Sequence, residues 1–181
     1  LGLIDAGYFE EAEDILQNFA EKGVPGKINV EGEDEEEIRA DTYPLFILAA
    51  DKLRRHYKIS ENIESAMDEA FNNLETDGKG VVEHDPNGTW MDTLERPKAV
   101  DIQALWLKAA EIMEDETKEK ELQEGLKEYN EEKGILDHLG DNPAQTVNPS
   151  VPLMFEFFDS DSLSKINAEF SSRFGSRTRA V

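Results

Sequence analysis

The hydrophobic residues of this chain recur mainly every three to four positions, which is the spacing of one face of an α-helix. Four segments have apolar residues along one face only and charged residues elsewhere, at 8–22, 61–75, 116–131 and 161–173. Three others are apolar on several sides, at 41–57, 100–113 and 151–158. A helix that is apolar all round is buried, so the second group is predicted to lie inside the first.

Loops separate these predicted helices at clear breaks in the pattern. Pro25-Gly26 opens a loop after the first helix, and residues 76–96 are rich in Gly, Asp and Pro, with Val81-Val82 as a candidate short strand. Pro44 is compatible with a helix, because a proline in the first turn loses no intrahelical hydrogen bond. The alternation of buried and one-faced helices favours concentric inner and outer layers over a four-helix bundle. We therefore predict a single all-α domain over residues 1–181, built from about seven helices in concentric helical hairpins.

Composition and charge narrow the classes of function. The net charge of −22 repels the phosphates of nucleic acids and anionic membrane surfaces, so neither is an expected partner. The absence of cysteine excludes disulfides, thiolate metal sites and a cysteine nucleophile. The longest apolar run, 44–50, is too short to span a bilayer, and no signal segment opens the sequence, so a cytoplasmic location is expected.

Three polar clusters precede the helices predicted to be buried. Their residues are Arg39, Asp41, Thr42 and Tyr43 in the first; Trp90, Asp92, Arg96, Asp101 and Gln103 in the second; Asn142, Gln145 and Asn148 in the third. Carboxylates and amides pair with hydroxyl groups, and an aromatic face stacks on sugar C–H groups. The combination is typical of carbohydrate recognition.

Each of these residues also has a purely structural interpretation. Asp41 stands where a helix N-cap is expected, and Asp101 in a first turn is favoured by the helix dipole. Trp106 lies at core spacing within its helix. Asp92 is the least easily explained in this way, because it belongs to no charge run and lies beside Trp90.

The sequence gives no sign of a metal or an organic cofactor. His56, His84 and His138 lie in different segments without metal-ligand spacing, and we interpret them as surface or loop residues. The acidic run at 31–37 lacks the alternating Asp/Asn order and central Gly of a calcium loop. Gly78-Lys79-Gly80 alone does not make a phosphate-binding loop.

One stretch resembles a known family. TWMDTLERPKAVDIQALWLKAAEIM, residues 89–113, looks like the TWMDA…RxGKPVEINALWYNAL stretch of glycogen debranching enzymes, in their amylo-α-1,6-glucosidase part. Four weaker likenesses occur in the same order along the chain, namely LGLIDAGYFEEAEDILQNFA, RADTYPLFILAADKL, NPAQTVNPSVPLM and RFGSRTRA. Together they touch nearly the whole sequence, and the central one is the most specific.

The resemblance implies an (α/α)6 toroid that hydrolyses α-1,6-linked glucose in glycogen or branched dextrins with inversion. It makes Asp92 the general acid, Trp90 the wall of the glucose pocket, and Asp41 a partner of the sugar hydroxyls. Asp101, Gln103, Asn142 and Gln145 fall at further substrate-binding positions of the family motifs. An oligosaccharide or polysaccharide is then the expected partner, and two carboxylates need no cofactor.

Several departures from the family pattern favour an alternative. The family has Glu where this chain has Asp101, and the family Arg before Pro-Asn-Gln is missing, with Asp141-Asn142-Pro143-Ala144-Gln145 in its place. The catalytic base of the family lies downstream of the segment that ends this sequence, and a full toroid has twelve helices. The chain therefore resembles a partial segment, and a non-catalytic or degenerate glycan-binding relative is the alternative. A helical scaffold that binds protein partners is a third, generic possibility.

Overall fold

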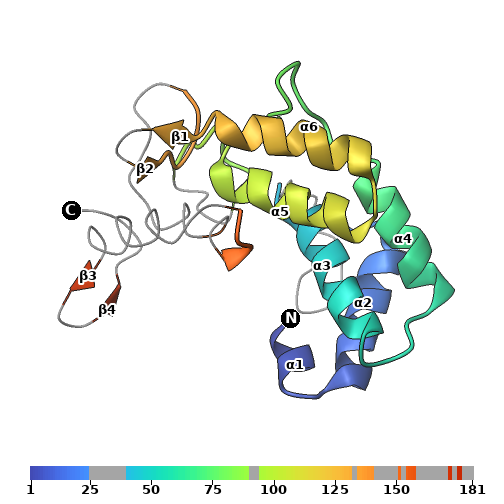
Figure 1. Ribbon diagram of the computed structural model, residues 1–181. Coiled ribbons are helices and arrows are strands. Elements are labelled where there is room, and N and C mark those ends of the chain that lie inside the picture. The colour runs from blue at the N-terminus through green and yellow to red at the C-terminus, as the bar shows by residue number, and fades with distance from the viewer. Residues whose placement is uncertain are drawn as a thin grey trace.

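A computed structural model describes residues 1–24, 40–89, 94–131, 134–140, 151, 154–157, 171–172 and 175–176. Within these residues the protein is all-α, as predicted (Figure 1). The helices are α1 (Gly2–Asp5), α2 (Phe9–Glu21), α3 (Thr42–Arg54), α4 (Glu61–Phe71), α5 (Val100–Ile112) and α6 (Glu116–Lys127). The four strands have two residues each: β1 (Asn130–Glu131), β2 (Gly134–Ile135), β3 (Ser171–Ser172) and β4 (Gly175–Ser176).

Helices α3 and α5 pack against each other, and each has a more exposed helix beside it. α3 contacts α2 and α4, and α6 lies along α5 (Figure 1). Ten of the thirteen residues of α5 are buried, whereas α6 buries only Leu122, Gly125 and Leu126. The predicted division into buried and one-faced helices is therefore confirmed for α2 to α6.

Local sequence signals fix where two of the outer helices begin. The Ser60 hydroxyl caps α4 by accepting a hydrogen bond from the Ile63 amide, and its own proton goes to Gln17 of α2 at 2.7 Å. Asp115 caps α6 by accepting from the amides of Thr117 and Lys118. These polar side chains satisfy amide groups that a helix N-terminus leaves without an internal partner.

A close contact of two glycines joins α6 to the loop before α5. Gly80 has a φ of +80°, and a Cβ on Gly125 of α6 would overlap the Gly80 carbonyl. The buried Gln103 amide spans the same contact, because its nitrogen donates to the carbonyls of Gly80 at 2.9 Å and Leu122 at 2.8 Å. The absence of side chains at both glycines lets α6 approach this loop closely.

Several predicted bounds were wrong. α6 ends at Lys127 rather than at 131, because Asn130–Glu131 pairs with Gly134–Ile135 as an antiparallel hairpin. Residues 171–172, predicted to end a helix, instead pair with Gly175–Ser176. α1 was not predicted, and Val81–Val82 forms only a single bridge, between Thr76 and Val82.

The structure describes only parts of the last two predicted helices, 151–158 and 161–173. The prediction that 151–158 is buried was wrong at Met154, which is 76% exposed, while Phe155 and Phe157 contact each other as tilted rings at a centroid distance of 5.7 Å. Residues 158–170, most of the last predicted helix, lie outside the described residues. Among the described helices, none has the length and apolarity required to cross a bilayer.

Candidate functional site

The loops that precede α3 and α5 meet at one place. The Ala40 amide, just before α3, donates to the Gly88 carbonyl at 2.6 Å. The Arg96 amide, just before α5, donates to the Pro86 carbonyl at 2.8 Å. The first two polar clusters of the sequence are therefore joined through the loop at 86–89.

Arg96 is the centre of this junction and is fully buried. Its guanidinium forms two bonds to the Asp101 carboxylate, at 2.5 and 3.4 Å, and two to the Asp137 carboxylate, at 2.8 and 3.2 Å. It also donates to the Thr89 hydroxyl at 3.3 Å. A single side chain therefore fixes a loop, the first turn of α5 and the segment after β2.

The two carboxylates favour the charged form of Arg96. Burial disfavours the charge of Arg96, but hydrogen bonds and attraction from Asp101 and Asp137 outweigh that cost and raise the pKa of the guanidinium. Bidentate Arg–carboxylate pairs are among the strongest hydrogen-bonded contacts in proteins. Within the described part of the chain, every buried polar side-chain atom has a hydrogen-bond partner.

The segment at 137–139 runs beside the start of α5. The Val100 amide donates to the Asp137 carbonyl at 2.9 Å, and Ala99 forms a bridge with His138. His138 is only 3% exposed, and its Nδ1 lies 3.1 Å from the Asp137 carboxylate. Its interpretation as a surface or loop residue was wrong, because sequence spacing gives no sign of this long-range packing.

His84 supports the first turn of α5 from another direction. Its Nε2 accepts a hydrogen bond from the Ala99 amide at 2.9 Å, and its Nδ1 lies 2.8 Å from the Asp85 carbonyl. This pairing requires a proton on Nδ1 and none on Nε2, so the imidazole is neutral. Burial lowers the pKa of His84, which is consistent with that state. His56 is exposed and stacks on Phe9, as expected for a surface residue.

Asp77 and Tyr129 hold the backbone at Lys98, between Arg96 and α5. Lys98 has a φ of +51°, a left-handed conformation that is uncommon for a residue with a side chain. Its ammonium pairs with Asp77 at 2.6 Å, and its carbonyl accepts from the Tyr129 hydroxyl at 2.9 Å. The pairing with Lys98, against a smaller effect of burial, lowers the pKa of Asp77 to about 2.

The structure describes three of the seven predicted site residues. Asp41 stands at the N-cap of α3, as its structural interpretation requires, but its carboxylate forms no capping hydrogen bond. Asp101 is 2% exposed and bound to Arg96. Gln103 is fully buried, and its oxygen accepts from the Val82 amide at 2.8 Å. The remaining four, Trp90, Asp92, Asn142 and Gln145, lie outside the described residues.

Asp101 and Gln103 therefore differ in geometry from residues that face a ligand. The carboxylate of Asp101 and all the hydrogen-bonding groups of the Gln103 amide are occupied inside the protein. Trp106, predicted to be core, is 3% exposed and packs against Phe71. In this structure Asp101 and Gln103 stabilise the loops around the start of α5 through buried hydrogen bonds.

An open cleft of about 570 Å³ lies next to the junction. Pro97, Lys98, Leu139 and Gly140 form one part of its lining, and Asp77, Lys79, Val81 and Glu128 the other. Its charged side chains are paired across the cleft, Lys98 with Asp77 and Lys79 with Glu128 at 2.8 Å. The charged side chains of the lining therefore have partners within the protein.

The residues missed by sequence reasoning are Asp137 and His138. Neither lies in a motif, and Asp137 is 41 residues away from Arg96. The one available signal was Arg96 itself, an arginine just before a helix predicted to be buried. A buried arginine requires acidic partners, but the sequence does not say which of 41 acidic residues supply them.

The hydrogen bonds of the junction hold its side chains in fixed orientations, but its described residues do not form a set of metal ligands. Within the described ranges, no three His, Asp or Glu side chains lie close enough together to hold a metal ion.

Comparisons with known protein families, with curated proteins and with solved structures found no match to this chain. Function therefore has to be argued from the sequence and from the geometry of the junction.

Proposed function

We propose that the chain is the acid-bearing part of a glycoside hydrolase that acts on α-1,6-linked glucose in glycogen or branched dextrins. Asp92 is the general acid, and Trp90 walls the glucose pocket. The catalytic base comes from residues beyond these 181, as the family resemblance implies. An inverting mechanism then uses these two carboxylates to protonate the leaving oxygen and to activate a water.

The single observation that carries the proposal is the junction of the loops before α3 and α5. The hydrogen bond from Ala40 to Gly88 brings the start of α3 to the loop that leads into Trp90. Arg96 ties the end of that loop to Thr89 and to α5. A pocket assembled from several loops requires a rigid support of this kind, because acid catalysis depends on a carboxyl group held in position.

The proposal gives Asp101 and Gln103 a supporting role. Their contacts hold Arg96 and Gly80 in place. The supporting role follows from burial, since a side chain with its polar groups occupied inside the protein cannot bind a hydroxyl without breaking those bonds. The residues proposed to face the sugar, from the family resemblance, are Asp41, Trp90, Asn142 and Gln145.

The test is Asp92→Asn in the parent protein that includes the residues after Val181. Loss of the acid is expected to reduce glucose release from a branched dextrin by about 100-fold or more. The variant is expected to keep the saccharide-dependent rise in melting temperature, because the amide still fits the pocket. Asp68→Asn, at an exposed position of α4, is the matched control and is expected to change neither measurement.

Two results would contradict the catalytic assignment. Normal glucose release by Asp92→Asn would remove Asp92 from the mechanism. A melting temperature that rises with dextrin, without glucose release from the unaltered protein, would favour the non-catalytic glycan-binding relative. The Asp at position 101, where the family has Glu, and the missing family Arg in the stretch 141–145 are the observations that favour this second candidate.

A further inference from the structure

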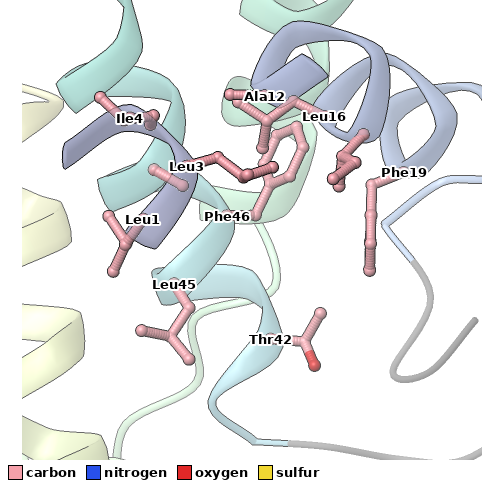
Figure 2. A pocket seen from close by; sticks show the side chains of 11 residues that line it. Leu1, Leu3, Ile4, Ala12, Leu16, Phe19, Thr42, Leu45 and Phe46 are labelled. Atoms are coloured by element: carbon pink, nitrogen blue, oxygen red, sulfur yellow. The ribbon is translucent and has the colours of Figure 1, made fainter. Parts of the chain in front are cut away.

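An open apolar groove lies between α1, α2 and the first half of α3 (Figure 2). Its volume is about 350 Å³. Ten of its eleven lining side chains are apolar, and Thr42 is the exception. Ile4, Leu16 and Phe46 form a buried floor, each at most 7% exposed.

The rim of the groove exposes large hydrophobic side chains. Leu1 is 50% exposed, Leu3 37% and Ile15 49%. These are three of the five large hydrophobic residues that are exposed in the described part of the chain. Single exposed apolar residues are ordinary, but a contiguous group around a groove marks an interaction site.

The construction of the walls limits what can fill the groove. All three walls are helices, so no sheet edge is available to a strand. The Thr42 side chain is the only polar side chain of the lining. An occupant must therefore satisfy its own backbone hydrogen bonds and present apolar side chains, which an amphipathic helix does.

The charges on α1 and α2 indicate which kind of partner helix the groove would favour. α1 and α2 carry acidic residues and no Lys or Arg; the acids are Asp5, Glu10, Glu11, Glu13, Asp14 and Glu21. The Lys52 ammonium, which comes from α3, is paired with Asp5. Like charges repel at an interface, so a second copy of this chain, with a net charge of −22, is disfavoured.

We propose that the groove binds an amphipathic helix of a partner protein, with the apolar face of that helix against Leu16 and Phe46 and with Lys or Arg residues along its flanks. The basic flanks lie over the acidic residues of α2. This proposal does not depend on the carbohydrate proposal, because none of the described partners of Arg96 lines the groove.

Binding is tested with a fluorescent helical peptide of about 18 residues, with Leu on one face and Lys on the flanks. A second peptide has Glu in place of each Lys. We expect the Lys peptide to bind the 181-residue protein at least about tenfold more tightly than the Glu peptide, measured by fluorescence anisotropy.

Groove variants separate docking from general attraction to an acidic protein. Ile15→Asn and Leu3→Asn keep the full net charge and remove rim hydrophobics, and each is expected to weaken binding by about tenfold. Met154→Asn is the matched control, because it removes an exposed hydrophobic side chain outside the groove and is expected to bind normally. Circular dichroism checks that all three variants remain folded.

Three outcomes would overturn the proposal. Equal binding of the Lys peptide to the groove variants and to the unaltered protein would mean that charge alone attracts it. A dimer in sedimentation that Ile15→Asn dissociates would place a second copy in the groove. No measurable binding of the Lys peptide at low salt, where charge attraction is strongest, would leave the groove without its proposed occupant.

Discussion

Arg96 is the residue whose side chain makes the most buried polar contacts described in the junction. It replaces contacts with water by bonds to two carboxylates and one hydroxyl. A buried ion pair gives modest net stability, because desolvation offsets attraction, but removal of one partner leaves the other charge buried alone. Substitution of Arg96 should therefore lower the free energy of unfolding by more than its ion pairs contribute to it.

Arg96→Met is expected to lower the free energy of unfolding by about 3–5 kcal/mol, because Asp101 and Asp137 lose their cation. Urea unfolding measures this change. Addition of Asp101→Asn and Asp137→Asn to the same chain should recover part of the loss, since the orphaned charges are then gone. Lys120→Met, which removes an exposed partner of Glu116, is the control and should change stability little. A loss below about 1 kcal/mol for Arg96→Met would contradict the central role of this residue.

His84 should make stability depend on pH. Burial lowers its pKa in the folded protein, against the opposing hydrogen bond to Asp85, so the unfolded chain binds a proton more readily. Stability is therefore full above the ordinary histidine pKa of about 6.5 and declines as pH falls below it, by at most about 1.4 kcal/mol per pH unit.

His84→Gln is the variant that isolates this effect, because a glutamine oxygen can accept from the Ala99 amide without titrating. Urea unfolding at pH 7.5 and 5.5 should show a smaller loss of stability in the variant than in the unaltered protein. His56 and His138 are present in both proteins, so the comparison isolates His84. An equal loss in both would show that His84 does not contribute to the pH dependence.

At the scale of elements, the helices were predicted well and their ends less well. The predicted segment 100–113 became Val100–Ile112, and 61–75 became Glu61–Phe71. Helical spacing depends on each helix having one apolar face toward a core, which is a local property of the sequence. The ends depend on tertiary contacts, such as the Leu136 amide bonded to the Tyr129 carbonyl after α6.

The packing of α6 depends on Gly125. Gly125→Ala places a methyl group against the Gly80 carbonyl and 2.8 Å from the Gln103 nitrogen. We expect a loss of about 1–3 kcal/mol in the free energy of unfolding, although alanine favours helix more than glycine. Thermal or urea unfolding measures it.

A control for this substitution comes from Gly78, where an added Cβ would meet no atom within 4 Å. Gly78→Ala is expected to change stability by well under about 1 kcal/mol. A stabilising effect of Gly125→Ala would mean that helix propensity outweighs the close contact with the loop.

At the scale of the whole molecule, α3 and α5 form an inner pair with more exposed helices beside them. This arrangement leaves an open apolar groove beside α1 and α2 and a buried polar junction before α5. The peptide experiment tests the groove, and the Asp92→Asn experiment tests the carbohydrate proposal. Since none of the described partners of Arg96 lines the groove, either proposal can fail without the other.

Apolar periodicity, a local property of the chain, was enough to predict the all-α class and the buried or one-faced character of α2 to α6. The sequence also indicated that polar loops precede the buried helices. Only the tertiary structure decided that Arg96 takes Asp101 and Asp137 as partners, that His138 is buried, and that Gln103 is occupied internally. These outcomes join residues far apart in the chain, and among many similar acidic side chains only three-dimensional packing selects the pair.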